Sequence, residues 1–194
     1  MLLGDGQKLE SVVVACLLFL ATLLSSGCSD EPKPASGKIV YQFLANAKSA
    51  EVAEYNRERV NFGAEFTINK EKRAVLWEHP PAEVQFDDIA IPQNAVLQFG
   101  IAISPEAWDK KGDGVTFEIT VVDQKSAKIQ IFSGYIDPKA NSSDRKWSDH
   151  DVDLTDFAGQ KVSFIFGTTP GPRGDATYDG AGWSNPQVRL KTGG

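Results

Sequence analysis

Two polar segments of this sequence carry aspartates at spacings that can bind a hard cation. Residues 148–153 read SDHDVD, and a strand there would place the three aspartates on one face. Residues 109–114 read DKKGDG, which is acidic but lacks the alternating ligands of an EF-hand loop. The candidate metal ligands are Asp109, Asp113, Asp149 and Asp151. The alternative interpretation, which stays open, is that these carboxylates are solvated or bond the backbone of neighbouring turns.

Aromatic and arginine side chains gather in the longest polar segments, and they suit recognition of a sugar. A sugar ring presents an apolar C–H face that stacks on an indole, while charged groups bond its hydroxyls. The candidate binding residues are Trp108, Trp147, Arg145, Arg173 and Tyr178. In the alternative interpretation, these loop aromatics plug the ends of the folded domain and touch no ligand.

The sequence lacks the motifs of common catalytic sites. It contains two histidines, His79 and His150, but no Gly-x-Ser-x-Gly elbow, phosphate-binding loop or HExxH sequence. We therefore expect a protein that is not an enzyme.

Alternating apolar residues predict that short β-strands position these groups. The period-two segments are 62–68, 75–77, 84–91, 97–103, 115–121, 129–131, 152–154, 162–166 and 188–190. Residues 39–53 fit either one helical face or a short strand followed by a short helix. About nine strands with regular turns favour an all-β, two-layer antiparallel β-sandwich, with a signal helix and little other helix.

The same alternation predicts which aromatic side chains are buried and where the strands break. The expected buried aromatic residues are Phe117, Phe164, Phe166, Trp77 and Trp183. His79-Pro80-Pro81 should end a strand, because proline lacks the amide hydrogen that a central ladder needs. A change of parity predicts a bulge near residues 87–88. The Gly- and Pro-rich residues 167–182 should form a surface loop.

The N-terminal residues predict export and attachment to a membrane. Residues 11–24 are uncharged and short for a membrane span, as in the apolar region of a signal peptide. The sequence that follows, LLSSGC, resembles the lipobox of bacterial lipoproteins, although Ser25 stands where that family usually has Leu. The resemblance implies a signal peptide over residues 1–27 and lipidation of Cys28. An ordinary signal peptide or an uncleaved anchor is the alternative interpretation.

The residues after Cys28 predict a tether and an envelope location. Residues 28–37 are polar and proline-containing, which favours a flexible tether before a single β-sandwich domain at 38–194. By the same resemblance, Ser29 favours the outer membrane over retention in the inner membrane. We expect an extracytoplasmic lipoprotein on the periplasmic face, anchored to the membrane by its acyl chains.

The charge of the chain argues against a nucleic-acid partner. Residues 1–27 hold two of the 26 acidic and one of the 20 basic residues, so removing them leaves a net charge of −5. The longest basic run is Lys110-Lys111, whereas phosphate neutralisation needs a basic surface.

Several segments of the second half resemble one family of extracytoplasmic domains. They are IPQNAVLQFGI at 91–101, WD at 108–109, GDGVTF at 112–117, YIDPK at 135–139, DVDLTDFAGQ at 151–160, TPGP at 169–172 and DGAGWSNPQV at 179–188. This series is similar to the galactose-binding-like jelly-roll β-sandwich, a fold used by non-catalytic carbohydrate-binding modules. The resemblance implies a binding role and leaves room for a structural calcium ion. Gly180 departs from it, because the family often has an aromatic residue there.

Two functional classes follow from these observations. The first is a lipid-anchored, non-catalytic protein that binds carbohydrate through its loops. The second is a structural accessory subunit that docks on an envelope or membrane protein complex. Neither class requires catalysis.

Overall fold

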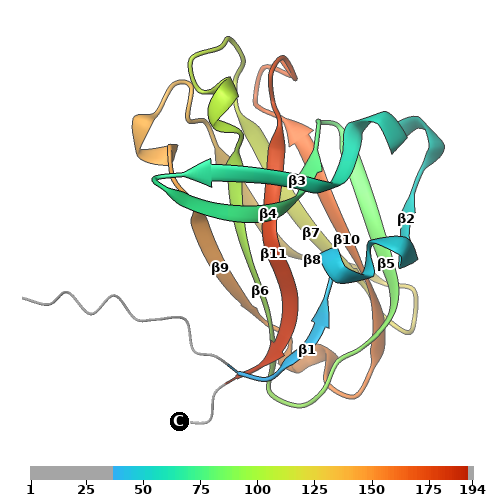
Figure 1. Ribbon diagram of the computed structural model, residues 1–194. Helices are drawn as coiled ribbons and strands as arrows, with labels where there is room; N and C mark the ends of the chain where they lie inside the picture. Colours follow the sequence, from blue (N-terminus) through green and yellow to red (C-terminus); the bar gives the residue numbers. More distant parts are fainter. Residues whose placement is uncertain (1–36, 192–194) are drawn as a thin grey trace, which may run out of the picture. The chain divides into compact units, whose positions relative to one another are not determined.

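The computed structural model describes residues 37–191, which form two antiparallel β-sheets packed face to face (Figure 1). The predicted signal peptide, Cys28 and nearly all of the tether lie outside the described residues. No helix within residues 37–191 is both long enough and apolar enough to cross a membrane. The predicted all-β sandwich is confirmed.

The first sheet has the order β3-β4-β11-β6-β9, and β1 pairs with the C-terminal part of β11. Its strands are β1 (Ile39–Gln42), β3 (Val60–Ile68), β4 (Glu71–Glu78), β6 (Ala95–Ile103), β9 (Ser148–Asp153) and β11 (Ala181–Leu190). The second sheet has the order β2-β5-β10-β7-β8. Its strands are β2 (Ala50–Val52), β5 (Ala82–Ala90), β7 (Val115–Val122), β8 (Lys128–Ile136) and β10 (Lys161–Pro170).

Helical structure among the described residues is limited to short 3₁₀ turns. They are η1 (Leu44–Ser49), η2 (Glu54–Arg59), η3 (Pro105–Ala107), η4 (Ser142–Asp144) and η5 (Thr155–Phe157). Residues 39–53 therefore form a strand, a 3₁₀ turn and a second strand, close to the second of the two alternatives. The described part of the chain has eleven strands rather than about nine, because β1 and β2 are too short to show a clear period.

The core between the sheets is rich in aromatic rings. Phe117, Phe164 and Phe166 have no exposed surface, as their alternation predicts. Trp183 is equally buried and makes edge-to-face contacts with Phe117, at 4.9 Å between ring centroids, and with Phe166, at 5.3 Å. Burying each large apolar side chain stabilises the fold by about 1.5–3 kcal/mol, so these rings account for much of the cohesion between the two sheets.

A second, smaller cluster lies on the outer face of the first sheet. We call it the outer cluster: Phe66, Ile68, Val75 and Ala102, with Ala64, Trp77, Trp108 and Trp147 packed against it. Figure 1 shows the β3–β4 hairpin crossing in front of β11 and β6. Gly182 permits this close approach, because a Cβ atom there would lie 2.5 Å from the Phe66 ring.

The strand interruptions follow the sequence closely. β4 ends before His79-Pro80-Pro81, and the pairing of β5 with β10 shifts between Phe86 and Ile89, which confirms the bulge. Asp88 in this bulge has a positive φ of 58°. The loop predicted over 167–182 is shorter, because β10 continues to Pro170 and β11 begins at Ala181.

Candidate functional site

An open cleft of about 1190 Å³ lies where three segments meet. β4 contributes Trp77 and the residue after its end, His79, while the turn after β6 and the loop before β11 form the other walls. Its lining residues are Trp77, His79, Ser104, Glu106, Ala107, Lys110, Gly174, Asp175, Ala176, Thr177, Tyr178 and Gly180. We call it the loop cleft. It combines aromatic surface with charged and hydroxyl groups, as small-molecule sites do.

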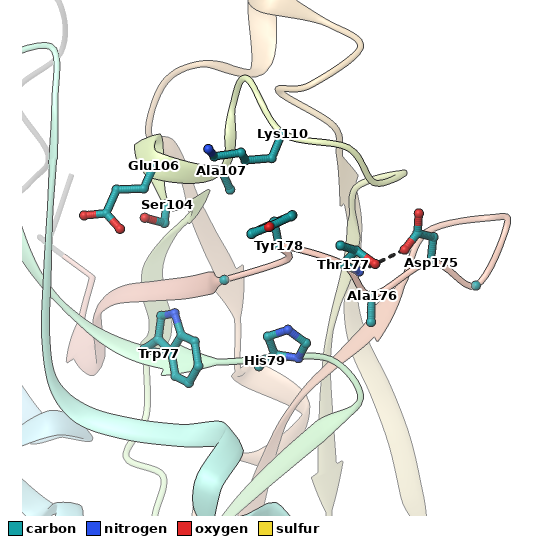
Figure 2. Close-up of a pocket in the computed structure, with 12 residues that line it drawn as sticks. Trp77, His79, Ser104, Glu106, Ala107, Lys110, Asp175, Ala176, Thr177 and Tyr178 are labelled. Atoms are coloured by element: carbon teal, nitrogen blue, oxygen red, sulfur yellow. Dashed lines mark hydrogen bonds between the residues drawn. The ribbon is translucent and has the colours of Figure 1, made fainter.

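Trp77 and His79 form the β4 wall of the cleft, at the point where the prolines that follow end the strand. Trp77 and His79 are two positions apart and so share one face of the chain, with 6.2 Å between their ring centroids. Both side chains are half-buried, and Figure 2 shows them together on one side of the cleft. The prediction that Trp77 is a core residue therefore needs correction: it packs on the outer cluster and lines the cleft.

Gly180 explains why Trp77 can occupy this position. A Cβ atom at residue 180 would lie 2.8 Å from Nε1 of Trp77, so any larger side chain would displace the indole. An aromatic side chain at residue 180 would therefore have no room beside Trp77. The backbone of Gly180 also accepts a hydrogen bond of 2.8 Å from the amide of Ser104, which joins two of the cleft walls.

Tyr178 faces the β4 wall from the loop before β11. Its side chain is 57% exposed, and its backbone has a positive φ of 58°, which is uncommon outside glycine. Lys110 Nζ lies 5.9 Å from the centre of its ring, within the range of a cation–π contact. Figure 2 shows the ring between Lys110 on one side and Trp77 with His79 on the other. The cleft thus presents an aromatic residue on each of two facing walls.

The charged groups of the cleft include both signs. The Thr177 side chain and amide both lower the pKa of the Asp175 carboxyl, which is therefore ionised at neutral pH. The amide contact to Asp175 Oδ1 is 3.0 Å long. Glu106 and Lys110 are exposed on the opposite wall. Such a mixture offers both donors and acceptors to the hydroxyls of a neutral ligand.

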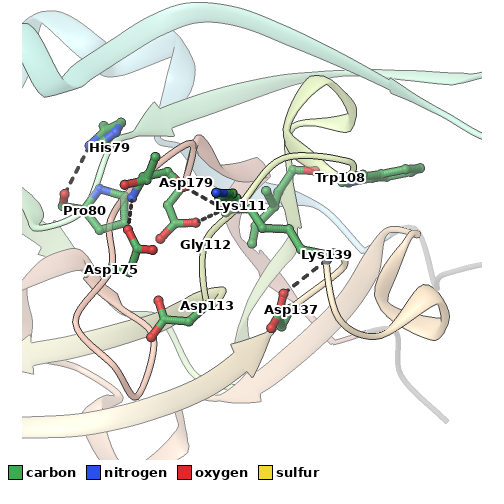
Figure 3. A network of polar contacts seen from close by, with 12 residues as sticks. His79, Pro80, Trp108, Lys111, Gly112, Asp113, Asp137, Lys139, Asp175 and Asp179 are labelled. Carbon is green, nitrogen blue, oxygen red and sulfur yellow. Dashed lines mark hydrogen bonds and ion pairs between the residues drawn. The ribbon is translucent and has the colours of Figure 1, made fainter.

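A buried ammonium group joins the loops that shape the cleft. Lys139 Nζ donates to Asp179 Oδ1 at 2.6 Å, to the Thr177 carbonyl at 2.8 Å and to the Lys111 carbonyl at 3.0 Å. The side chains of Lys139 and Asp179 are 4% and 0% exposed. Figure 3 shows Lys139 extending from its own loop toward Lys111 and Asp179 on two others. Burial raises the pKa of Asp179, while Lys139 opposes that rise and Asp113 and Asp175 add to it.

Asp113 supports the same loops from the other side of this network. It is 1% exposed, and its Oδ2 accepts a short hydrogen bond from the amide of Arg173. The guanidinium of Arg173 donates to the Gly112 carbonyl at 3.0 Å, and the Tyr135 hydroxyl donates to the Asp113 carbonyl at 2.5 Å. These contacts hold the loop before β11 against the loop before β7.

The other three candidate metal ligands pair with arginines. Asp109 contacts Arg145 at 3.0 Å, Asp151 contacts Arg189 at 3.0 Å, and Asp149 receives two hydrogen bonds from Arg73. Within residues 37–191 no group of three or more His, Cys, Asp or Glu side chains is arranged to hold a metal. The carbonyl and carboxylate oxygens that a calcium ion would need as ligands are found around the Lys139 ammonium, where they accept its hydrogen bonds.

The predicted sugar-binding residues are divided between the cleft and the packed regions. Tyr178 lines the cleft. Arg173 lies on the same loop, directly before Gly174, which lines the cleft. Trp108 donates from Nε1 to the Ile103 carbonyl at 2.9 Å. Arg145 donates to the carbonyls of Pro138, at 2.9 Å, and Trp108, at 3.1 Å. Both side chains therefore brace loops rather than line the cleft.

Trp147 also lies outside the loop cleft. It stacks on Phe66 with 6.2 Å between ring centroids and an interplanar angle of 19°, and the Arg73 guanidinium covers its ring at 4.8 Å. The structure thus groups Trp108 and Trp147 in the outer cluster. The sequence did not identify Trp77, His79 and Lys110 as cleft residues. The available signal was the pair of prolines after His79, which marks the end of β4 next to the loops.

Comparisons with known proteins give one relative in sequence and a set of similar folds. No family model matches the chain. An uncharacterized protein of Archaeoglobus fulgidus is 45% identical over 127 residues, which cover 62% of this chain and 32% of that protein. The chain therefore spans about a third of the length of its curated relative.

The similar structures include domains of several carbohydrate-binding modules. The CBM51-2 and INT domains of Clostridium perfringens ZmpB align with a TM-score of 0.50 at 14% identity, over 74% of this chain and 30% of that one. The CBM22-1 xylan-binding domain of Paenibacillus barcinonensis Xyn10C aligns with a TM-score of 0.49 at 11% identity, over 84% and 100%. At such identities the likeness concerns the fold alone. The described part of the chain therefore has a β-sandwich fold like that of the CBM51-2 structure.

Proposed function

We propose that this protein is a lipid-anchored, extracytoplasmic, non-enzymatic protein that binds carbohydrate in the loop cleft. The observation that carries the proposal is the facing pair of aromatic side chains, Trp77 and Tyr178, with charged and hydroxyl groups around them. A pyranose ring stacks on such surfaces through its C–H groups, and Asp175, Lys110 and Ser104 supply partners for its hydroxyls. The β-sandwich fold supports a binding role without naming the sugar.

The test of this site is a glycan array probed with the purified protein and with a Tyr178→Ala variant. The array supplies the sugar ligand for a titration, in which the variant is expected to bind about tenfold more weakly, a loss of about 1.4 kcal/mol. Tyr178 is 57% exposed, so the melting temperature should change little. Tyr55→Ala is the matched control, because Tyr55 is 78% exposed and lines a different cavity. Unchanged affinity of the Tyr178 variant would remove the loop cleft as the sugar site.

We also propose that acylation of Cys28 anchors the protein, with the outer membrane favoured. The proposal rests on the apolar run before SSGC and on the polar tether after it. Mass spectrometry of the membrane-extracted protein should find Cys28 as the N-terminal residue with added acyl mass. A Cys28→Ser variant should lose that mass and appear in the soluble fraction. An intact leader followed by an unmodified thiol would contradict the prediction.

A further inference from the structure

One triplet of the sequence, Asn141-Ser142-Ser143, has the form Asn-x-Ser, with a middle residue other than proline. Such a triplet is the acceptor sequence for an N-linked glycan, a bulky polar modification carried on surface loops of exported proteins. No other asparagine of the sequence is followed two residues later by Ser or Thr. The triplet lies in the loop between β8 and β9 and does not line the loop cleft, so it is separate from the sugar site proposed above.

The loop presents the whole triplet to solvent. Asn141, Ser142 and Ser143 are all exposed, and the short turn η4 begins within the triplet. Figure 1 shows this turn, in light orange, at the periphery of the sandwich. A transferase has to reach the acceptor amide from solvent. A surface loop on a rigid scaffold meets that need, whereas a paired strand does not.

The side chains of the triplet are in contact with one another. Asn141 Oδ1 accepts a hydrogen bond of 2.9 Å from the Ser143 hydroxyl and one of 3.2 Å from the Ser143 amide. The hydroxyl that defines the motif therefore touches the side chain that would be modified. Asn141 Nδ2 carries two hydrogens, and it donates one of them to Asp144 Oδ1 at 3.2 Å. The other hydrogen has no acceptor among residues 37–191, so this exposed nitrogen is accessible on that side.

The backbone of this loop is held by groups other than the Asn141 side chain. Asp137 Oδ1 accepts hydrogen bonds from the amides of Lys139, at 3.1 Å, and Ala140, at 3.2 Å. Asp144 Oδ2 accepts a hydrogen bond from the Asp137 amide at 2.9 Å. A sugar on Asn141 Nδ2 replaces one hydrogen and leaves the other for Asp144. Attachment of a glycan therefore breaks none of these contacts.

We infer that Asn141 carries an N-linked glycan. The inference rests on the proposed extracytoplasmic location, because an exported chain meets membrane-bound sugar donors. The donor class is an oligosaccharide joined through its anomeric carbon to the diphosphate of a membrane lipid. Asn141 Nδ2 forms a bond to that carbon, the bond from the carbon to the diphosphate oxygen breaks, and the electron pair leaves with the diphosphate. Nδ2 gives up one proton to a base of the transferase and keeps its second hydrogen.

The test is mass spectrometry of the protein extracted from the membranes of its own cells and then denatured. Trypsin cleaves after Lys139 and Arg145 and releases residues 140–145, which contain the triplet. We expect this peptide to carry the added mass of sugar residues on Asn141. A sugar held only in the loop cleft would not survive denaturation, so the readout does not depend on that site. Recovery of the peptide in unmodified form alone would overturn the inference, and an acylated Cys28 in the same digest would show that the proposed location still stands.

Three variants identify the attachment site. Asn141→Gln replaces the acceptor amide by one on a longer side chain, and Ser143→Ala removes the required hydroxyl, so both should lose the sugar mass completely. Ser142→Ala is the matched control and should keep the mass, because the middle position accepts any residue except proline. All three positions are exposed, so the variants should fold with melting temperatures close to one another. Sugar retained in the Asn141 or Ser143 variant, or lost in the Ser142 variant, would overturn the inference.

Discussion

Replacement of Lys139 by Met is expected to lower the free energy of unfolding by about 3–5 kcal/mol, the usual cost of removing one partner from a buried ion pair. Met keeps the length of the aliphatic chain but removes the ammonium. Asp179 would then stay buried without its cation, and the carbonyls of Lys111 and Thr177 would lose a donor. Since a domain has about 5–15 kcal/mol of stability in total, urea titration should detect the change readily.

A double-mutant cycle tells whether the ion pair carries this effect. Asp179→Asn alone leaves Lys139 buried beside a neutral amide, whereas the double variant removes both charges. The double variant should therefore be less destabilised than the sum of the two single variants. Lys191→Met is the matched control, because its ion pair with Asp153 is exposed to solvent and such pairs stabilise a fold little. Additive single effects, or a Lys139 variant as stable as the control, would show that the buried pair does not anchor these loops.

The Lys139 variant should also affect the loop cleft. Thr177 and Asp179 flank Tyr178, so loosening both removes the contacts that hold its ring in place. We expect sugar affinity to fall more than in the Tyr178→Ala variant, because Trp77 and Tyr178 would no longer face each other. The same titration measures both variants.

The central strands were predictable because their signal is local. Phe117, Phe164 and Phe166 lie on the apolar parity of long strands, and a single register buries all of them. The bulge near Asp88 was predictable for the same reason, since one extra residue reverses the parity of the strand. The short strands β1 and β2 cover four and three residues, too few for a period to be seen.

The loop cleft was only partly predictable, because its residues meet through long-range contacts. Lys139 bonds groups that lie 28, 38 and 40 residues away in the chain, and no local pattern identifies such partners. Trp77 alternates with Val75 as a core residue would. The β3–β4 hairpin places both side chains on the outer face of the sheet. Alternation shows that they share a face but does not show which face lies toward the core.

The aspartate candidates show the same limit. An acidic face on a strand serves a cation and an arginine equally well, and the sequence does not reveal which residue lies opposite. Arg73 and Arg189, which belong to β4 and β11, pair with Asp149 and Asp151 of β9. The arrangement of strands in the sheet decides this outcome.

The second large effect expected is a loss of stability with rising pH that depends on Glu78. This residue has no exposed surface and lies on the inner face of β4, on the parity of Leu76. Burial raises the pKa of Glu78 to about 8 from 4.5, and the nearby carboxylate of Glu83 adds to the rise. The Trp183 indole and the Thr168 hydroxyl approach the carboxyl and oppose that rise, although none of these groups has a partner at good hydrogen-bond geometry.

The direction of the pH effect follows from proton linkage. Between pH 4.5 and 8 the folded protein keeps the Glu78 proton that the unfolded chain releases. The stability contributed by this group is therefore complete below pH 4.5, and it declines by about 1.4 kcal/mol per pH unit as the pH rises toward 8. Over the whole window the loss amounts to several kcal/mol, which is comparable with the total stability of a domain.

A Glu78→Gln variant isolates this contribution, because glutamine has nearly the same size and does not titrate. Near pH 5 the variant and the wild-type protein should unfold at similar urea concentrations. Near pH 8.5 the variant should be more stable by several kcal/mol, since the wild-type carboxyl must either stay protonated or ionise in the core. Glu54→Gln is the matched control: Glu54 is exposed and is not among the groups that shift the pKa of Glu78, so its difference from wild type should change far less over the same range. A difference between Glu78→Gln and wild type that stays constant from pH 5 to 8.5 would mean that Glu78 is not buried as a protonated acid.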